Sequence, residues 1–143
     1  MDTDVVRSKV EPIFRRNDSV VLAYLIGSAA RGDMHARSDL DFAVLLRDNS
    51  IDIYMALWAD LHDALAPMPF DLAILNGAHP VFGFEVIREG VPLFYRSVDE
   101  LNTFERRAWG RYQDTRHLRA IGDYYLDARS QEWLSRKKPS ASG

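Results

Sequence analysis

Three aspartates and a Gly-Ser pair are the residues in this chain whose types and spacing could do chemistry. Gly27 and Ser28 follow the apolar run "VVLAYLI", and ten residues later Asp39 and Asp41 stand on either side of a leucine at the start of a second apolar run. Asp71 lies at the start of a third, "FDLAIL". Carboxylates among apolar residues cost stability unless a partner compensates for them, which raises the question of what these three bind.

The spacing of the aspartates predicts a cation site. Residues two apart in a strand point to the same face, so Asp39 and Asp41 are expected to project together while Leu40 and Phe42 point into the core. If the strand that carries Asp71 lies beside them, about 4.8 Å away, three carboxylates converge. One of them would then protonate unless a cation neutralised the cluster. Ligand sets made only of oxygen suit Mg²⁺ or Mn²⁺.

The Gly-Ser pair predicts a phosphate site next to that cation. Gly27 lets the backbone approach a ligand closely, and Ser28 would open a short helix whose free N–H groups bind anions. Arg31 and Arg37 flank the loop and could neutralise phosphate oxygens. A phosphate-binding turn beside carboxylates that hold a divalent metal is the arrangement needed for phosphoryl or nucleotidyl transfer. A lone Asp-x-Asp is more often a solvated strand cap, and Asp71 alone would mean nothing, so the combination carries the interpretation.

The elements that must position these residues follow from hydrophobic periodicity. The pattern predicts one mixed sheet backed by helices, an α/β or α+β single domain over residues 1–136 with a long C-terminal helix and a disordered tail over 137–143. Gly110 and Gly122 could break the helical region 98–135 into pieces. Helices are expected at 3–18, 50–67 and 79–90, and strands at 19–27, 39–47, 70–76 and 91–96. The strand with Pro92 is expected at an edge of the sheet, and Trp58 and Leu118 are expected in the core.

Composition narrows the class of protein. The 143 residues suffice for one core, and the absence of cysteine excludes disulfides and thiolate zinc sites. Net charge is −3 with no dense basic run before the tail, which argues against direct binding of duplex nucleic acid. No apolar run approaches a membrane span and the acidic N-terminus lacks a signal peptide's apolar core, so we expect a cytoplasmic protein that does not contact a membrane.

The motif resembles a known signature. "GSAARGDMHARSDLD" reads as G-S-x10-D-x-D, which resembles the pattern of the DNA polymerase β-like nucleotidyltransferase superfamily. The segments "SDLDFAVLL", "DLAILN" and "VIREGVPLFYR" are similar to those of its minimal members, the MNT antitoxins encoded beside HEPN-domain toxins. The resemblance covers roughly Val5 to Tyr125.

This resemblance implies an activity and a partner. MNT antitoxins bind ATP and Mg²⁺ and transfer AMP, sometimes several units, to a tyrosine of a HEPN RNase, which silences the toxin. A hetero-oligomer with that toxin is therefore expected. The alternatives are an antitoxin that only covers its toxin, and a transferase acting on a small molecule such as an antibiotic. The intact aspartates favour the enzyme over the first alternative.

The resemblance also assigns roles by position. Gly27 and Ser28 would hold the triphosphate, with Arg31 as a phosphate contact. The metal ligands would be Asp39, Asp41 and Asp71, and Asp71 would also serve as base for the incoming hydroxyl.

The last helix carries two further patterns. Arg111 and His117 form R-x5-H, which resembles the RNase motif of HEPN domains, but the region supplies too little helix for such a bundle. We interpret the pair as a polar helix face. The aromatic residues of this region could bind a partner or pack the helix on the sheet, and the sequence does not decide between these; they are Trp109, Tyr112, Tyr124 and Tyr125.

Overall fold

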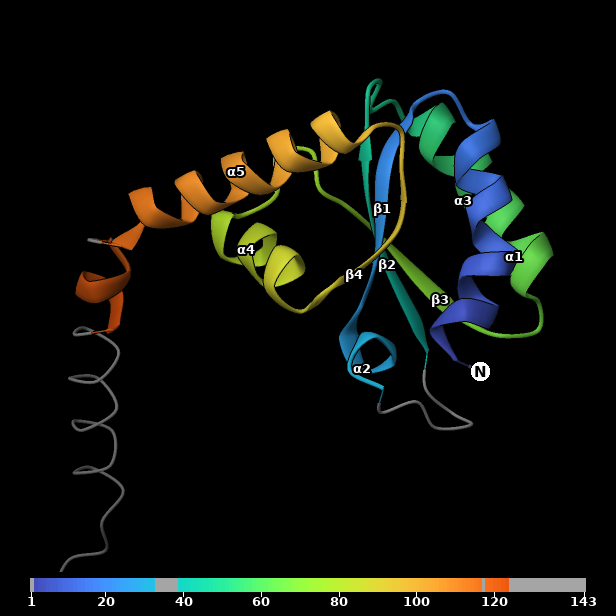
Figure 1. The fold of residues 1–143 in the computed structure, drawn as a ribbon, viewed down its shortest axis with the longest axis horizontal. Helices are drawn as coiled ribbons and strands as arrows, with labels where there is room; N and C mark the ends of the chain where they lie inside the picture. The colour runs from blue at the N-terminus through green and yellow to red at the C-terminus, as the bar shows by residue number, and fades with distance from the viewer. Residues whose placement is uncertain (1, 33–38, 117, 124–143) are drawn as a thin grey trace, which may run out of the picture.

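A computed structural model describes residues 2–32, 39–116 and 118–123. Helices and strands alternate along most of the chain (Figure 1). The helices are α1 (Thr3–Arg16), α2 (Gly27–Ala30), α3 (Ile51–Leu65), α4 (Pro80–Glu89) and α5 (Val98–Asp114). The strands are β1 (Val20–Ile26), β2 (Leu40–Leu46), β3 (Phe70–Ile74) and β4 (Val91–Tyr95).

The four strands form one mixed sheet in the order β3-β2-β1-β4. β1 pairs antiparallel with both β2 and β4, whereas β2 and β3 run parallel. Helices α1 and α3 cover one face of the sheet and α4 and α5 cover the other (Figure 1). The predicted mixed sheet flanked by helices is confirmed, and so is the placement of the strand with Pro92 at an edge.

The face under α1 and α3 holds the larger part of the core. α1 begins at Thr3 because the Asp2 carboxylate accepts a hydrogen bond from the Val5 N–H at 2.9 Å, which satisfies one of the free donors of the first turn. Apolar residues then recur at helical spacing and are buried against Phe42 and Val44 of β2. The buried residues of the two helices are Val6, Val10, Ile13 and Phe14 of α1 and Leu57, Leu61 and Leu65 of α3.

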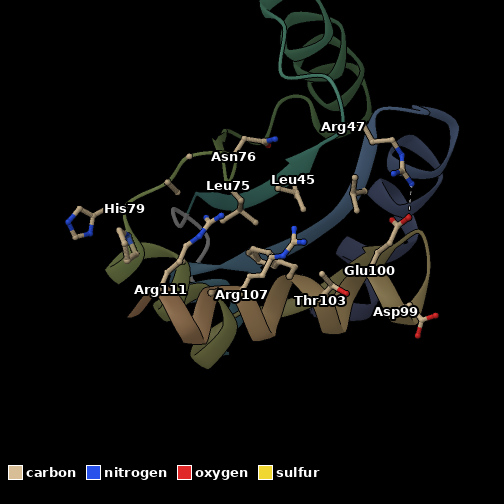
Figure 2. Close-up of a pocket in the computed structure, with 17 residues that line it drawn as sticks. Leu45, Arg47, Leu75, Asn76, His79, Asp99, Glu100, Thr103, Arg107 and Arg111 are labelled. Atoms are coloured by element: carbon tan, nitrogen blue, oxygen red, sulfur yellow. Dashed lines mark hydrogen bonds and ion pairs between the residues drawn. The ribbon is translucent and has the colours of Figure 1, made fainter. Parts of the chain in front are cut away.

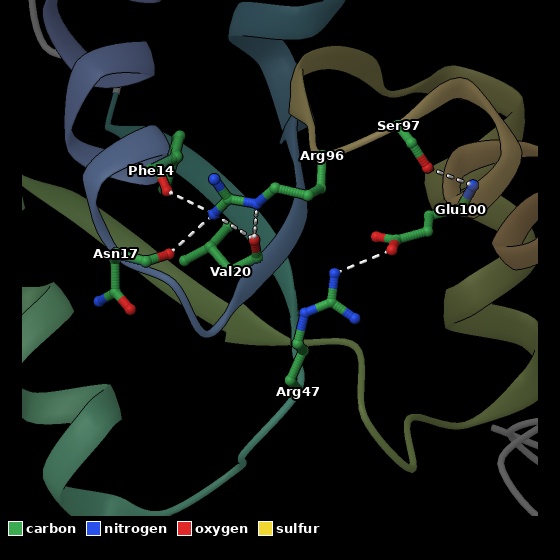
Figure 3. Close-up of polar contacts among 7 residues, drawn as sticks. All are labelled: Phe14, Asn17, Val20, Arg47, Arg96, Ser97 and Glu100. Carbon is green, nitrogen blue, oxygen red and sulfur yellow. Dashed lines mark hydrogen bonds and ion pairs between the residues drawn. The ribbon is translucent and has the colours of Figure 1, made fainter.

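The guanidinium of Arg96 fastens the end of α1 to the sheet (Figure 3). It donates hydrogen bonds to the backbone carbonyls of Arg15 at 2.9 Å, Asn17 at 2.9 Å and Val20 at 2.8 Å. The last carbonyls of a helix have no partner within the helix, so a multivalent donor at this position stabilises its C-terminus. Arg96 directly follows β4, and its side chain thereby joins the end of β4 to α1 and β1.

Helix α5 continues past the sheet that it covers (Figure 1). It runs through Gly110 to Asp114 without the predicted break. Leu118, expected in the core, is 67% exposed, because no strand lies beneath this part of the chain. Within the described residues, no helix is long and apolar enough to cross a membrane. The predicted disordered tail lies outside the described residues.

Candidate active site

Three neighbouring strands bring the sequence-predicted residues to one end of the sheet. The register pairs Ile26 at the end of β1 with Asp41 of β2, and Asp41 with Asp71 of β3. Gly27 follows Ile26 directly and begins the single helical turn of α2. The conditional prediction that the strand of Asp71 neighbours that of Asp41 is therefore confirmed, with the two carboxylates at directly opposed positions.

Gly27 is in contact with the carboxylate of Asp41. Its φ of +75° lies in the left-handed region that L side chains rarely adopt. A Cβ at this position would lie 2.5 Å from the Asp41 Oδ2, well inside contact distance. The absence of a side chain at Gly27 therefore does two things: it allows the sharp turn from β1 into α2, and it makes room for a carboxylate beside the turn.

The electrostatics of this site are those of a carboxylate cluster. The pKa of Asp41 is raised, first because partial burial removes water from the carboxylate, and then because the charges of Asp71 and Asp39 lie nearby. The protonated Asp41 also hydrogen-bonds to Asp71, which raises the pKa further. Without a bound cation, the three carboxylates therefore repel one another at this end of the sheet.

The third carboxylate is close to the pair but does not complete a ligand set. β2 begins at Leu40, so Asp39 precedes the strand and is exposed. Within the described residues, no group of three or more His, Cys, Asp or Glu side chains is arranged to hold a metal ion. The structure therefore brings Asp41 and Asp71 together and leaves Asp39 at the edge, where its charge reaches Asp41.

The phosphate-binding candidates lie around the same turn. Ser28 is partly buried within α2, and Arg31 follows that helix with about half of its side chain exposed. Arg31 lies 3.9 Å from the carboxylate of Glu89, at the end of α4. Sequence reasoning missed Glu89, because nothing in its spacing indicates that α4 ends beside α2. Arg37 lies outside the described residues.

The structure describes some of the aromatic and basic residues that the sequence singled out in the last helix. Tyr112 stacks on Phe84 of α4 with ring centroids 3.9 Å apart, whereas Trp109 is half exposed. Trp109 also lies against Phe84, with ring centroids 5.6 Å apart, so both residues pack α5 onto α4 although half of Trp109 is open to solvent. Arg111 is an exposed residue of α5. His117, Tyr124 and Tyr125 lie outside the described residues.

The fold and the site define a class of protein. The chain belongs to the family described as polymerase beta, nucleotidyltransferase, whose model matches residues 8–99 and therefore includes the Gly-Ser turn and all three aspartates. No curated protein sequence matches the chain.

Several solved structures contain chains that are similar to this one. The chain is 29% identical to a chain of a toxin–antitoxin structure with AMP-PNP, with 87% of this chain and 98% of that chain covered and a TM-score of 0.70. It is 26% identical to a chain in the complex of tri-AMPylated Shewanella oneidensis HEPN toxin with MNT antitoxin, covering 89% and 98% at a TM-score of 0.67. It is 27% identical to a chain of the toxin–antitoxin MntA–HepT, covering 90% and 99% at a TM-score of 0.65.

Proposed function

We propose that this protein is an antitoxin that transfers AMP from ATP to a tyrosine of a HEPN-type RNase toxin and thereby neutralises it. The observation that carries the proposal is that Asp41 lies beside the Gly27 turn and is paired in register with Asp71 on the neighbouring strand. This arrangement supports a divalent-metal site beside a backbone turn that could bind phosphate. The similar structures with AMP-PNP and with an AMPylated HEPN toxin support ATP as donor and a toxin as acceptor.

The side chains divide the work. Gly27 and Ser28 hold the triphosphate through the backbone N–H groups and hydroxyl at the turn, and Arg31 contacts a phosphate oxygen. When bound, Mg²⁺ or Mn²⁺ supplies charge neutralisation for the triphosphate and for the hydroxyl that reacts. The carboxylates fit such an ion because all donors are oxygen and the charges of Asp71 and Asp39 lie close to Asp41.

The ligands for that ion would be Asp39, Asp41 and Asp71. Because Asp39 is exposed at the start of β2, its side chain is free to turn toward the other two. In the reaction, the tyrosine oxygen forms a bond to the α-phosphorus of ATP and its proton passes to Asp71. The bond from the α-phosphorus to the bridging oxygen breaks, and pyrophosphate leaves. The proposal includes a cytoplasmic location, because ATP and an RNase toxin would meet inside the cell.

Intact mass spectrometry of the partner tests the proposal. The product of the adjacent reading frame, which the proposal expects to be a HEPN protein, is incubated with this chain, ATP and Mg²⁺. We expect a gain of one or more AMP masses, lost with Asp39→Ala/Asp41→Ala and retained with Asp48→Ala, an exposed aspartate beyond the other end of β2. No gain from the wild type, while the two proteins still co-elute, would refute the transfer and support an antitoxin that acts by binding. Mass gain on an antibiotic alone would support the small-molecule transferase.

A further inference from the structure

A second pocket lies at the end of the sheet opposite the carboxylate site. It has a volume of about 460 Å³, which is within the range of ligand sites, and it lies between α5, the start of α4 and the far ends of β2 and β3. Leu45 and Leu75 line it, each four residues beyond the aspartate of its own strand. The pocket is therefore about 13 Å along the strands from the proposed nucleotide site.

The pocket combines an apolar floor with a basic wall (Figure 2). Leu45 and Leu75 form part of the floor, with Phe104 of α5 beside them. Arg107 and Arg111 project from α5 toward this floor, one helical turn apart (Figure 2). An occupant must therefore offer apolar surface and negative charge together.

The two guanidinium groups have no counter-charge within the described part of the chain. Neither Arg107 nor Arg111 makes a hydrogen bond or ion pair with any residue in the described part of the chain. The third arginine of the pocket, Arg47, is by contrast paired with Glu100 at 2.8 Å. Like charges one turn apart on a helix repel, so the arginine pair weakens α5 until an anion lies between them.

The opposite end of the pocket holds the carboxylate of Glu100, which is paired with Arg47. The Glu100 side chain as a whole is 33% exposed, so a hydrogen-bond donor of the occupant would reach it on its open side. From Glu100 to Arg111 is about 16 Å along the helix, the length of roughly five residues of extended chain.

We infer that this pocket receives an extended acidic segment of the toxin. The inference rests on the proposed function for the identity of the partner. Carboxylates of the segment pair with Arg107 and Arg111, an apolar side chain covers the floor, and a donor near the other end reaches the exposed side of Glu100. The length of the pocket and the separation of its two polar ends favour an extended peptide over a compact anion. Docking there leaves the carboxylate end of the sheet open to the toxin's tyrosine.

Charge reversal on α5 tests the docking site. The pocket variant is Arg107→Glu/Arg111→Glu. The matched control is Arg106→Glu/Arg116→Glu, which makes the same charge change at exposed positions of the same helical region that do not line the pocket. Affinity for the purified toxin is measured by calorimetry at two salt concentrations, and AMP-PNP binding with Mg²⁺ reports an intact fold.

We expect the pocket variant to lose about tenfold or more in toxin affinity, with a weaker salt dependence, while the control changes by no more than about threefold. At saturating toxin the pocket variant should transfer AMP at the wild-type rate with a raised KM. Equal losses in both variants, or none in the pocket variant, would overturn the docking site. If the wild type binds toxin but transfers no AMP, the proposed chemistry fails while the affinity comparison still tests the pocket.

Discussion

Replacing Gly27 by alanine should disable the site by two separable effects. The first is backbone strain: a residue with a Cβ at φ +75° costs roughly 1–2 kcal/mol of folding free energy. The second is a collision, because the new Cβ would lie 2.5 Å from the Asp41 Oδ2, whereas ordinary contact begins at 3.4 Å. The Asp41 carboxylate must therefore move by close to 1 Å, and a displacement of that size can cost about a hundredfold in rate.

The chain provides a matched control at Gly77. Its φ of +66° imposes similar backbone strain on alanine, but a Cβ there would meet no atom within 4 Å. We therefore expect Gly27→Ala and Gly77→Ala to lose a similar roughly 1–2 kcal/mol in urea unfolding. At saturating toxin and ATP, only Gly27→Ala should lose AMP transfer, by about a hundredfold.

Two results would refute this reasoning. Wild-type transfer by Gly27→Ala would show that contact between the turn and Asp41 does not matter to the reaction. Equal losses of transfer in both variants would show that backbone strain alone accounts for the effect.

Three further outcomes follow from named contacts. Burial and neighbouring carboxylates raise the pKa of Asp41, so the metal-free wild type should lose stability as the pH rises from the ordinary carboxyl range through that raised pKa. In thermal melts, Asp41→Asn should therefore be more stable than the wild type at neutral pH, and the difference should vanish in acid. Leu61→Ala in the buried face of α3 should cost about 2–5 kcal/mol in urea unfolding, against less than about 0.5 kcal/mol for the exposed Ile51→Ala. Arg96→Lys should cost roughly 1–3 kcal/mol, because one ammonium cannot reach the carbonyls of α1 and β1 together; a loss no larger than that of Arg47→Lys, whose ion pair is partly exposed, would contradict that role for Arg96.

Local spacing was enough to predict the elements of this fold. The buried positions of α1 follow the helical period, and the alternation in β2 places Phe42 and Val44 in the core with Asp41 on the other face. The turn at Gly27 and the edge strand with Pro92 also follow from the residue types alone. Periodicity of 3.6 or 2 residues is a property of the local backbone, so the sequence displays it directly.

Errors arose where a residue's environment depends on distant parts of the chain. Leu118 has the spacing of a core residue, yet α5 extends past the sheet and leaves it exposed. Trp58, expected to be buried, is 37% exposed and stacks on His62 instead. Neither outcome can be derived from spacing, because exposure depends on what the rest of the fold places opposite each side chain.

The sequence by itself determined the class of chemistry: a glycine turn, a serine and three aspartates at strand starts. Only the tertiary structure decided that Asp71 opposes Asp41, because strand order depends on how helices cover both faces of the sheet. It also placed Glu89 beside Arg31 and formed the basic pocket under Arg107 and Arg111. These contacts join residues far apart in the chain, and they exist only because burial of the two apolar clusters draws the helices onto the sheet.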